Sequence, residues 1–352
     1  MKHVIIIGGG FAGLNCARKL ASHSDVRITL IDKNNYQQFQ PLLYQVAAAV
    51  LAPSNAAFSL RNVLQQHSNV DVKMAEVVSA DLDTRTVETA NGEKYQGDFL
   101  VFAAGAQANF FGTPGAAKHA FPLYSLRDAE LLRSRILEVL ESVDRDPSLI
   151  NRGALNFVVV GAGPTGTEMA GTLGDMTQRM LKNVYKDLDL SKSRVILVDM
   201  AHNVLNGFSE ESQRYAAKML EQHGVEIRLG APVKEVTDVD VLLADGTRIP
   251  TRTAIWAGGL KASPLSSKLG LKLGRGGRID VRPDFSLEGF SGVYALGDFA
   301  NIAGADGKAL PQLAAVAQQA GKYCAKHIAD AIDGKPGEPF HYFDKGIKEL
   351  WL

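Results

Sequence analysis

Residues 2–20 read KHVIIIGGGFAGLNCARKL, and this stretch decides the fold. A continuous apolar run leads into a cluster of glycines, after which apolar residues recur with helical spacing. This order predicts a buried parallel strand, a tight turn and a helix. The glycines that form the fingerprint of the turn are Gly8, Gly10 and Gly13.

A second predicted strand, VRITLID, ends in Asp32, 24 residues after Gly8. In a dinucleotide-binding unit the first glycine permits the turn, the second lets a pyrophosphate approach the backbone, and the third lets the helix pack on the strand. The carboxylate of Asp32 can accept hydrogen bonds from ribose hydroxyls. The glycine pattern is weak by itself, but here it lies in the strand, turn and helix context that it requires.

The same pattern returns in LNFVVVGAGPTGTEMAGTL, residues 155–173, and a following strand VILVD ends in Asp199. Asp199 lies 38 residues after Gly161, because the stretch GDMTQRMLKNVYKDLDLSKS lengthens the helix or its exit loop. Two other landmarks keep the copies in step. In both copies 97 positions separate the first turn glycine from the glycine of VFAAG or IWAGG, and an Asn-Gly or Asp-Gly hairpin signal precedes that strand.

The chain therefore carries a duplicated unit, and a late segment indicates how the copies are arranged. The sequence GFSGVYALGDFANI predicts a strand that runs into Asp298, followed by a helix. If this segment completes the first unit, the second is inserted within it, as in the glutathione-reductase-like α/β fold with two Rossmann-like dinucleotide-binding domains. We predict boundaries of 1–112, 113–275 and 276–352, with a helical bridge at 125–142 that Ser125 and Asp128 cap.

The composition excludes several classes of protein. The chain has 352 residues, and Lys+Arg 38 balance Asp+Glu 38, so the charge excess of a nucleic-acid binder is absent. No apolar run approaches the roughly 18 to 20 residues that cross a bilayer, and no signal peptide precedes the first strand. We therefore expect a cytoplasmic protein.

Two dinucleotide sites let one cofactor stay bound while another exchanges. The first site, completed by Asp298, suits FAD, held tightly but non-covalently, because its length needs contacts from both ends of the chain. The inserted site suits a nicotinamide nucleotide. Asp199 offers an acceptor for a 2′-hydroxyl, and the next three residues offer no arginine for a 2′-phosphate, so we predict NADH rather than NADPH.

Glu168 is the candidate catalytic residue, since the first copy has Asn15 at the equivalent position. The helix dipole alone favours an acid in a first turn by about 0.3 to 1 kcal/mol. The alternative is that Glu168 faces the nicotinamide and the flavin, where it orients the ring or relays a proton. The two cysteines, Cys16 and Cys324, lie on apolar helix faces and are not the closely spaced pair of a thiol relay. No metal cluster is evident, so the cofactor must carry the chemistry.

Motifs spread over residues 3–346 resemble the type II NADH:quinone oxidoreductases, which are single-subunit, non-proton-pumping, peripheral membrane flavoproteins of the respiratory chain. The motifs that carry the resemblance are GGGFAG, DKNNYQQFQPLLYQVA, FFGTPGAAKHAFPLYSLRDAELLR, VVVGAGPTGTEMAG, IWAGGLKASPL, VYALGDFANI and PFHYFDKG. Of these, PLLYQVA and GPTGTEMAG are considerably more specific than the glycine fingerprints.

The resemblance also implies roles for individual residues. Glu168 matches a glutamate between the nicotinamide and the quinone pocket, and Gln319 matches a glutamine of that pocket. The start of the last helix would lie against the flavin pyrimidine, where negative charge gathers on reduction. The implied FAD residues are Gly8, Gly9, Gly10, Phe11, Ala12, Gly13, Asp32, Lys33, Val77, Asp298, Ala314 and Ala315; those for NADH are Gly161, Gly163, Gly166 and Asp199.

The chain departs from the family pattern in two places. Ala315 stands where the family often has a glutamine. The family also continues for tens of residues into a region that docks on the bilayer, whereas this chain ends at Leu352, and IKELWL is too short for an interfacial helix. We therefore expect the docking region to be absent, with peripheral contact to the cytoplasmic face of the inner membrane only in a longer chain.

The expected function is hydride transfer from NADH to flavin and then transfer of two electrons to a quinone, without proton pumping. Two alternatives stay open. One is an NADH-dependent flavoprotein reductase of a soluble carrier or of oxygen, and the other is a low-turnover sensor that binds flavin and NADH. The expected partners are NADH and a quinone, with a homodimer as a further option.

Overall fold

The computed structural model describes residues 1–186, 188–304 and 307–344. These residues form two compact units. The first unit comprises Met1–Gln38, Ala57–Gln107 and the described residues from Leu260 onward, and the second comprises Phe39–Ala56 and Ala108–Gly259.

The first unit is built on a six-stranded sheet with the order β21-β22-β9-β1-β2-β5. Its strands are β1 (Lys2–Ile7), β2 (Val26–Asp32), β5 (Val70–Met74), β9 (Phe99–Phe102), β21 (Ser286–Leu287) and β22 (Phe290–Ala295). All neighbours are parallel except β21 and β22. The late strand β22 pairs with β9, so the end of the chain completes the sheet that the N-terminus begins, as the sequence predicts.

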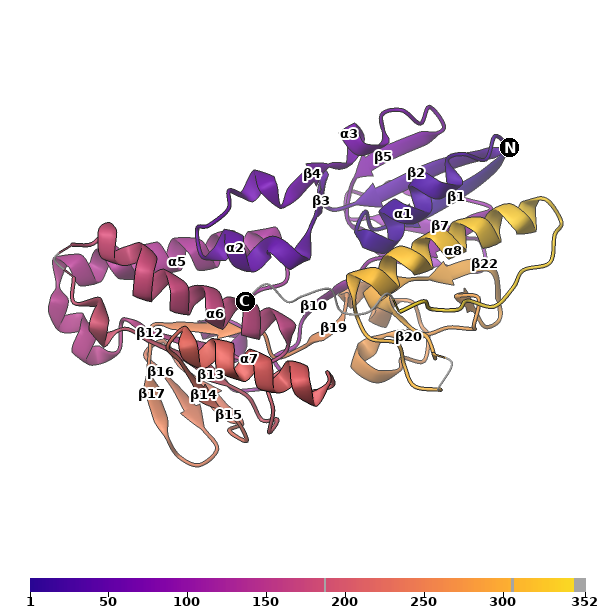
Figure 1. Cartoon of the computed structure of the whole chain (residues 1–352). Helices are drawn as coiled ribbons and strands as arrows, with labels where there is room; N and C mark the ends of the chain where they lie inside the picture. Colours follow the sequence, from indigo (N-terminus) through magenta and orange to yellow (C-terminus); the bar gives the residue numbers. More distant parts are fainter. Residues whose placement is uncertain (187, 305–306, 345–352) are drawn as a thin grey trace. The chain divides into compact units, whose positions relative to one another are not determined.

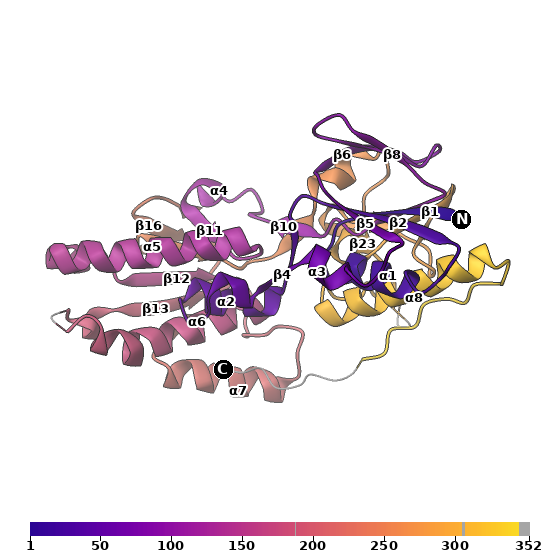
Figure 2. The ribbon, with the colours of Figure 1, turned by 90° about the horizontal axis from the view of Figure 1, so that it is seen from above.

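Helices and a small sheet provide the cores on the two faces of this sheet. On one face α1 (Phe11–Leu20) and α8 (Ala314–Ile332) run side by side, as Figures 1 and 2 both show. The other face is covered by the antiparallel strands β6 (Val77–Asp81), β7 (Thr86–Thr89) and β8 (Lys94–Gln96). Gly92, in the predicted hairpin between β7 and β8, has the left-handed φ of +84° that such a turn uses.

The second unit repeats this plan with a five-stranded parallel sheet of order β11-β18-β12-β13-β14. Its strands are β11 (Ala120–Pro122), β12 (Asn156–Val160), β13 (Arg194–Val198), β14 (Val225–Arg228) and β18 (Thr253–Trp256). Its main helices are α5 (Leu126–Arg145), α6 (Pro164–Asp175) and α7 (Glu210–Gln222), and its hairpin sheet is β15 (Val233–Val236), β16 (Asp240–Leu243) and β17 (Arg248–Pro250).

Shorter elements connect these parts. In the first unit they are β3 (Tyr36–Gln38), β4 (Ala57–Ser59), α3 (Leu60–Leu64), β19 (Leu260–Ala262), β20 (Ile279–Asp280), β23 (Ala300–Asn301), η7 (Pro264–Lys268), η8 (Arg275–Gly277) and η9 (Gly297–Phe299). In the second they are η1 (Gln40–Leu42), α2 (Leu43–Ala47), η2 (Pro53–Asn55), α4 (Ala116–His119), η3 (Pro147–Arg152), η4 (Met176–Met180), η5 (Leu181–Asn183) and η6 (Leu190–Lys192). The strand β10 (Ala106–Ala108) lies where the chain leaves the first unit after Gln107.

The predicted helical bridge corresponds to α5. The Ser125 side chain accepts a hydrogen bond from the Asp128 N–H, and the Asp128 carboxylate accepts one from the Ser125 N–H, at 3.2 and 2.8 Å. The helix continues to Arg145, three residues beyond the predicted end. The capping box that fixes its start was legible in the sequence.

The unit boundaries differ from the predicted ones in two ways. The chain returns to the first unit at Leu260 rather than at residue 276, because Ala262, Leu265 and Leu269 are buried in the core of that unit. Residues 39–56 leave the first unit, since α2 packs against α5 and α6, as Figure 2 shows. Of the predicted last segment, residues 345–352 lie outside the described part of the chain.

No helix in the described part of the chain is both long and apolar enough to span a membrane. Across the same residues no group of three or more His, Cys, Asp or Glu side chains is arranged to hold a metal ion.

Candidate functional site

The first glycine turn joins β1 to α1. Gly8 has a φ of +103°, and a Cβ there would overlap the Ala103 carbonyl, so the turn excludes any side chain. A Cβ at Gly13 would overlap the Gly8 carbonyl, which is how the turn brings helix and strand together. At Gly10, in contrast, a Cβ would meet no protein atom within 4 Å. This open face of backbone is where a pyrophosphate can approach.

Asp32 ends β2 beneath this turn. One carboxylate oxygen accepts from the Gly9 N–H at 2.6 Å, and the other accepts from the Asn34 N–H at 2.7 Å. Burial raises the pKa of Asp32, while these two bonds and the nearby Lys33 act in the opposite direction. Lys33 itself is exposed, and Val77 is buried at the start of β6.

The second glycine turn, between β12 and α6, repeats the first. Gly161 has a φ of +107°, a Cβ at Gly166 would overlap the Gly161 carbonyl, and a Cβ at Gly163 would again meet no protein atom within 4 Å. The Asp199 carboxylate accepts from the Ala162 N–H at 2.5 Å and from the Ala201 N–H at 2.7 Å. Asp199 therefore occupies the same place as Asp32, despite the longer connection that precedes it.

The extra residues of that connection prolong the helix and then loop back. After α6 the chain continues through the π-helical turn η4 and the 3₁₀ turns η5 and η6 before it enters β13. The extra stretch thus lengthens both the helix and its exit loop, and the position of Asp199 against the glycine turn is unaffected.

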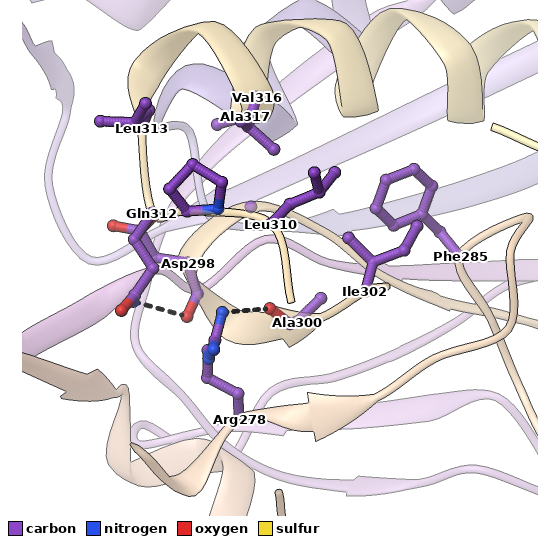
Figure 3. Close-up of a pocket in the computed structure, with 12 residues that line it drawn as sticks. Arg278, Phe285, Asp298, Ala300, Ile302, Leu310, Gln312, Leu313, Val316 and Ala317 are labelled. Atoms are coloured by element: carbon purple, nitrogen blue, oxygen red, sulfur yellow. Dashed lines mark hydrogen bonds between the residues drawn. The ribbon is translucent and has the colours of Figure 1, made fainter. Parts of the chain in front are cut away.

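A pocket in the first unit lies at the beginning of α8 (Figure 3). Asp298 and Gln312 line it, and the Gln312 amide donates to the Asp298 carbonyl at 3.3 Å. Ala314 and Ala315 are the first residues of α8, so their N–H groups belong to the positive end of the helix. From the start of α8, Leu313, Val316 and Ala317 line the pocket, whereas Ala314 and Ala315 are not among its lining residues.

Arg278 also lines this pocket, and the sequence did not single it out. Its side chain is buried, with Nε donating to the Arg275 carbonyl at 3.3 Å and Nη1 to the Ala300 carbonyl at 3.5 Å (Figure 3). Burial lowers the pKa of Arg278, while the Asp298 charge acts to raise it. The pocket thus contains a buried cation beside Asp298, and the sequence signalled it only by an arginine next to the short strand β20.

Glu168 lies in the first turns of α6 in the second unit and is half-buried. Burial raises its pKa to about 7, so the carboxyl can carry or release a proton near neutral pH. Burial, and then the charge of Glu168, raise the pKa of Tyr44, whose hydroxyl accepts a hydrogen bond from Gln45 at 3.0 Å. Tyr44 and Gln45 belong to α2, which packs on α6, and so the PLLYQVA motif borders the carboxyl.

Gln319 belongs to the first unit and Glu168 to the second. Gln319 does not line the pocket of Figure 3. Its amide donates to the Phe343 carbonyl at 2.9 Å and accepts from the Phe343 N–H at 3.0 Å.

Cys16 on α1 and Cys324 on α8 are both free thiols and fully buried, as predicted for small core residues. The fold brings the two side chains within hydrogen-bonding reach of one another. Burial raises the pKa of Cys324, and the neighbouring Cys16 thiol raises it further. No local sequence pattern indicates that these cysteines, 308 positions apart, would be neighbours.

Comparisons with known proteins agree with this geometry. The profile of the pyridine nucleotide-disulphide oxidoreductase family matches residues 2–321. The chain is 40% identical to the type II NADH:quinone oxidoreductase Ndh of Mycobacterium tuberculosis, over 97% of this chain and 76% of that protein. It is 31% identical to the Staphylococcus aureus enzyme of the same name, over 98% and 86%.

Solved structures show the same fold at lower identity. An NDH2 from Plasmodium falciparum in complex with NADH superposes with a TM-score of 0.82 at 18% identity, covering 93% of this chain and 83% of that one. A sulfide:quinone oxidoreductase from Aquifex aeolicus gives 0.79 at 20%, covering 96% and 78%.

The fold and the two glycine turns define a flavoprotein reductase with two dinucleotide-binding domains. The chain belongs to the pyridine nucleotide-disulphide oxidoreductase family and, within it, to the type II NADH:quinone oxidoreductases. It is an enzyme that oxidises NADH and reduces a quinone by way of a flavin.

Proposed function

We propose that the first unit binds FAD and that the second unit binds the NADH that is oxidised. The observation that carries this proposal is the twice-repeated geometry of a left-handed first glycine, an open second glycine and an aspartate bonded to the turn. A bound flavin would accept two electrons from NADH and pass them to the quinone.

The residues of the first unit fit FAD. The open space above Gly10 admits a pyrophosphate, and Asp32 at the end of β2 can accept from ribose hydroxyls. We assign Asp298, which lines the pocket at α8, to the ribityl chain, and the N–H groups of Ala314 and Ala315, at the start of α8 beside that pocket, to the pyrimidine ring of the flavin. The buried charge of Arg278 offsets that of Asp298 beside an anionic cofactor.

The residues of the second unit fit NADH. The turn glycines Gly161, Gly163 and Gly166 would hold the pyrophosphate, and Asp199 would accept from the adenosine ribose. Met200, which follows it, is 73% exposed, and the local sequence supplies no arginine for a 2′-phosphate. This supports a preference for NADH over NADPH.

We propose Glu168 as the proton donor for the acceptor reaction. Reduction of a quinone to a hydroquinone consumes two electrons and two protons, and a carboxyl with a pKa of about 7 can supply one of these protons and recover it from water. Tyr44 and Gln45 are the polar neighbours through which the proton can be replaced. Attachment to the membrane surface and a homodimer stay predictions from the sequence.

The direct test is the absorption spectrum of the purified protein under anaerobic conditions. We expect flavin bands that bleach on addition of NADH and return on addition of a naphthoquinone. A flavin that stayed oxidised with NADH would support a low-turnover sensor. A flavin that was reoxidised by oxygen or a carrier protein but not by quinone would support a reductase of a soluble carrier or of oxygen.

A further inference from the structure

The side chain of Gln319 is engaged by the peptide group of a residue 24 positions later. Both its donor and its acceptor face the backbone of Phe343, at 2.9 and 3.0 Å, in the manner of a single rung of a sheet. An amide that binds a quinone oxygen needs a donor directed at the ligand. To contact a quinone directly, Gln319 would have to break one or both of these bonds.

Residues 335–344, which we call the C-terminal strap, lie along α8. The Tyr323 hydroxyl donates to the Glu338 carbonyl, and the Phe340 N–H donates to the Pro283 carbonyl at 2.8 Å. The Phe340 ring packs against Phe285 and Tyr323, with centroids 4.9 and 5.3 Å apart. The strap is therefore held by packing near its middle and by Gln319 near its end.

The ring of Phe343 is not part of this packing. Phe343 is 68% exposed, although Gln319 forms hydrogen bonds with both the N–H and the carbonyl of its backbone. Gln319 lies five residues after Ala314, which is about 7 to 8 Å along a helix axis. The strap thus presents an apolar ring close to the end of α8 that we have assigned to the flavin.

We propose that Phe343 is a contact for the apolar ring of the quinone, and that Gln319 is a positioning residue that holds Phe343 in place without touching the acceptor. This inference rests on the proposed function, because it requires that the start of α8 faces the flavin. An exposed aromatic ring binds a planar quinone by stacking, and a fixed backbone lowers the entropy lost when it does so.

The test uses three variants of the whole flavoprotein. Gln319→Leu removes both hydrogen bonds. Phe343→Pro removes both the ring and the N–H that donates to Gln319, but leaves Gln319 itself intact. Phe343→Ala keeps the peptide group and removes the ring. Tyr215→Ala, which removes a 56% exposed ring from α7, is the matched control.

Two kinds of measurement separate holding the strap from binding the acceptor. Hydrogen–deuterium exchange over residues 335–344 should accelerate in Gln319→Leu and Phe343→Pro and should not change in Phe343→Ala. The KM for a water-soluble naphthoquinone should rise about tenfold in all three variants, as expected for a lost ring contact, while NADH:ferricyanide activity and flavin content are retained. The control should match the unsubstituted enzyme.

Two outcomes would overturn the proposal. An unchanged quinone KM in Phe343→Ala would show that the ring does not contact the quinone. Contact with lipid would then be the remaining role for this exposed ring. A raised KM in Gln319→Leu with unchanged exchange of the strap would make Gln319 a direct ligand. If the unsubstituted protein reduced ferricyanide but no quinone, the proposed function would fail, yet the exchange data would still report whether Gln319 holds the strap.

Discussion

Asp199 accepts a hydrogen bond from the backbone N–H of Ala162, 37 residues earlier in the chain, at 2.5 Å. The equivalent bond in the first unit joins Asp32 to Gly9 at 2.6 Å. In each unit a carboxylate at the end of the second strand of the motif therefore stabilises the glycine turn through bonds within the protein itself, independently of any bound nucleotide. The same side chain can serve the turn and the nucleotide, which gives substitutions there a predictable effect.

Asp199→Ala should weaken NADH binding about ten- to a hundredfold, the range of a hydrogen bond to a charged group, and should leave flavin content unchanged. Titration of NADH by stopped-flow reduction of the flavin would measure this. Asp32→Ala is the control and should lose flavin instead. Equal NADH affinity in Asp199→Ala would assign the ribose to another residue.

Gly10→Ala should give a folded protein that lacks flavin. Gly10 has ordinary φ and ψ of −74° and −162°, and an added Cβ meets no protein atom, so the methyl would occupy only the space proposed for the pyrophosphate. Circular dichroism and the ratio of flavin to protein absorbance would separate the two properties. Gly13→Ala, whose Cβ would overlap the Gly8 carbonyl, should instead lower stability. Retained flavin in Gly10→Ala would place the pyrophosphate elsewhere.

Glu168→Gln should lower quinone-dependent turnover at least about tenfold. General acid catalysis usually contributes about a hundredfold or more. Flavin content and the rate of flavin reduction by NADH should be retained, because glutamine keeps the shape of the side chain. Comparison of NADH:quinone with NADH:ferricyanide steady-state rates would measure the effect. Unchanged quinone turnover would reduce Glu168 to its role in the first turn of a helix.

Stability should fall as pH rises through the range in which Glu168 titrates. Its pKa is raised from 4.5 to about 7 in the folded protein, so between these values the native state holds a proton that the unfolded state has released. This contribution to the free energy of unfolding is fully present below about pH 4.5 and is lost by about pH 7. It is on the order of 2 kcal/mol once the remaining exposure of the carboxyl is allowed for. Urea unfolding of the enzyme and of Glu168→Gln across this range would measure it, since the variant should lack this component. Parallel pH dependences would contradict the raised pKa.

Much of this molecule could be predicted from local sequence. Gly8, Gly13 and their counterparts identify the turns because only glycine tolerates the backbone there, and Ser125 with Asp128 identifies the start of α5 because the capping box is a short-range device. The segment GFSGVYALGDFANI predicted a late strand that would complete the first unit, and β22 is that strand.

Other features depended on contacts that no local pattern encodes. The packing of α2 beside Glu168, the neighbouring positions of Cys16 and Cys324, and the burial of Arg278 all join segments distant in the chain. Gln319 was predicted as a residue of the quinone pocket, but its type could not indicate that a peptide group would occupy its amide. The cofactor and catalytic roles of all these residues stay predictions until the variants are measured.

The pairing of β22 with β9 also sets an order for biosynthesis. When residue 259 has left the ribosome, every described strand and helix of the second unit has been made, whereas the sheet of the first unit still lacks β22 and its covering helix α8. The inserted unit can thus mature during translation. The N-terminal strands must wait, with one edge unpaired, until roughly the last fifth of the polypeptide emerges, and nascent chains are most exposed to aggregation and chaperone capture in that interval.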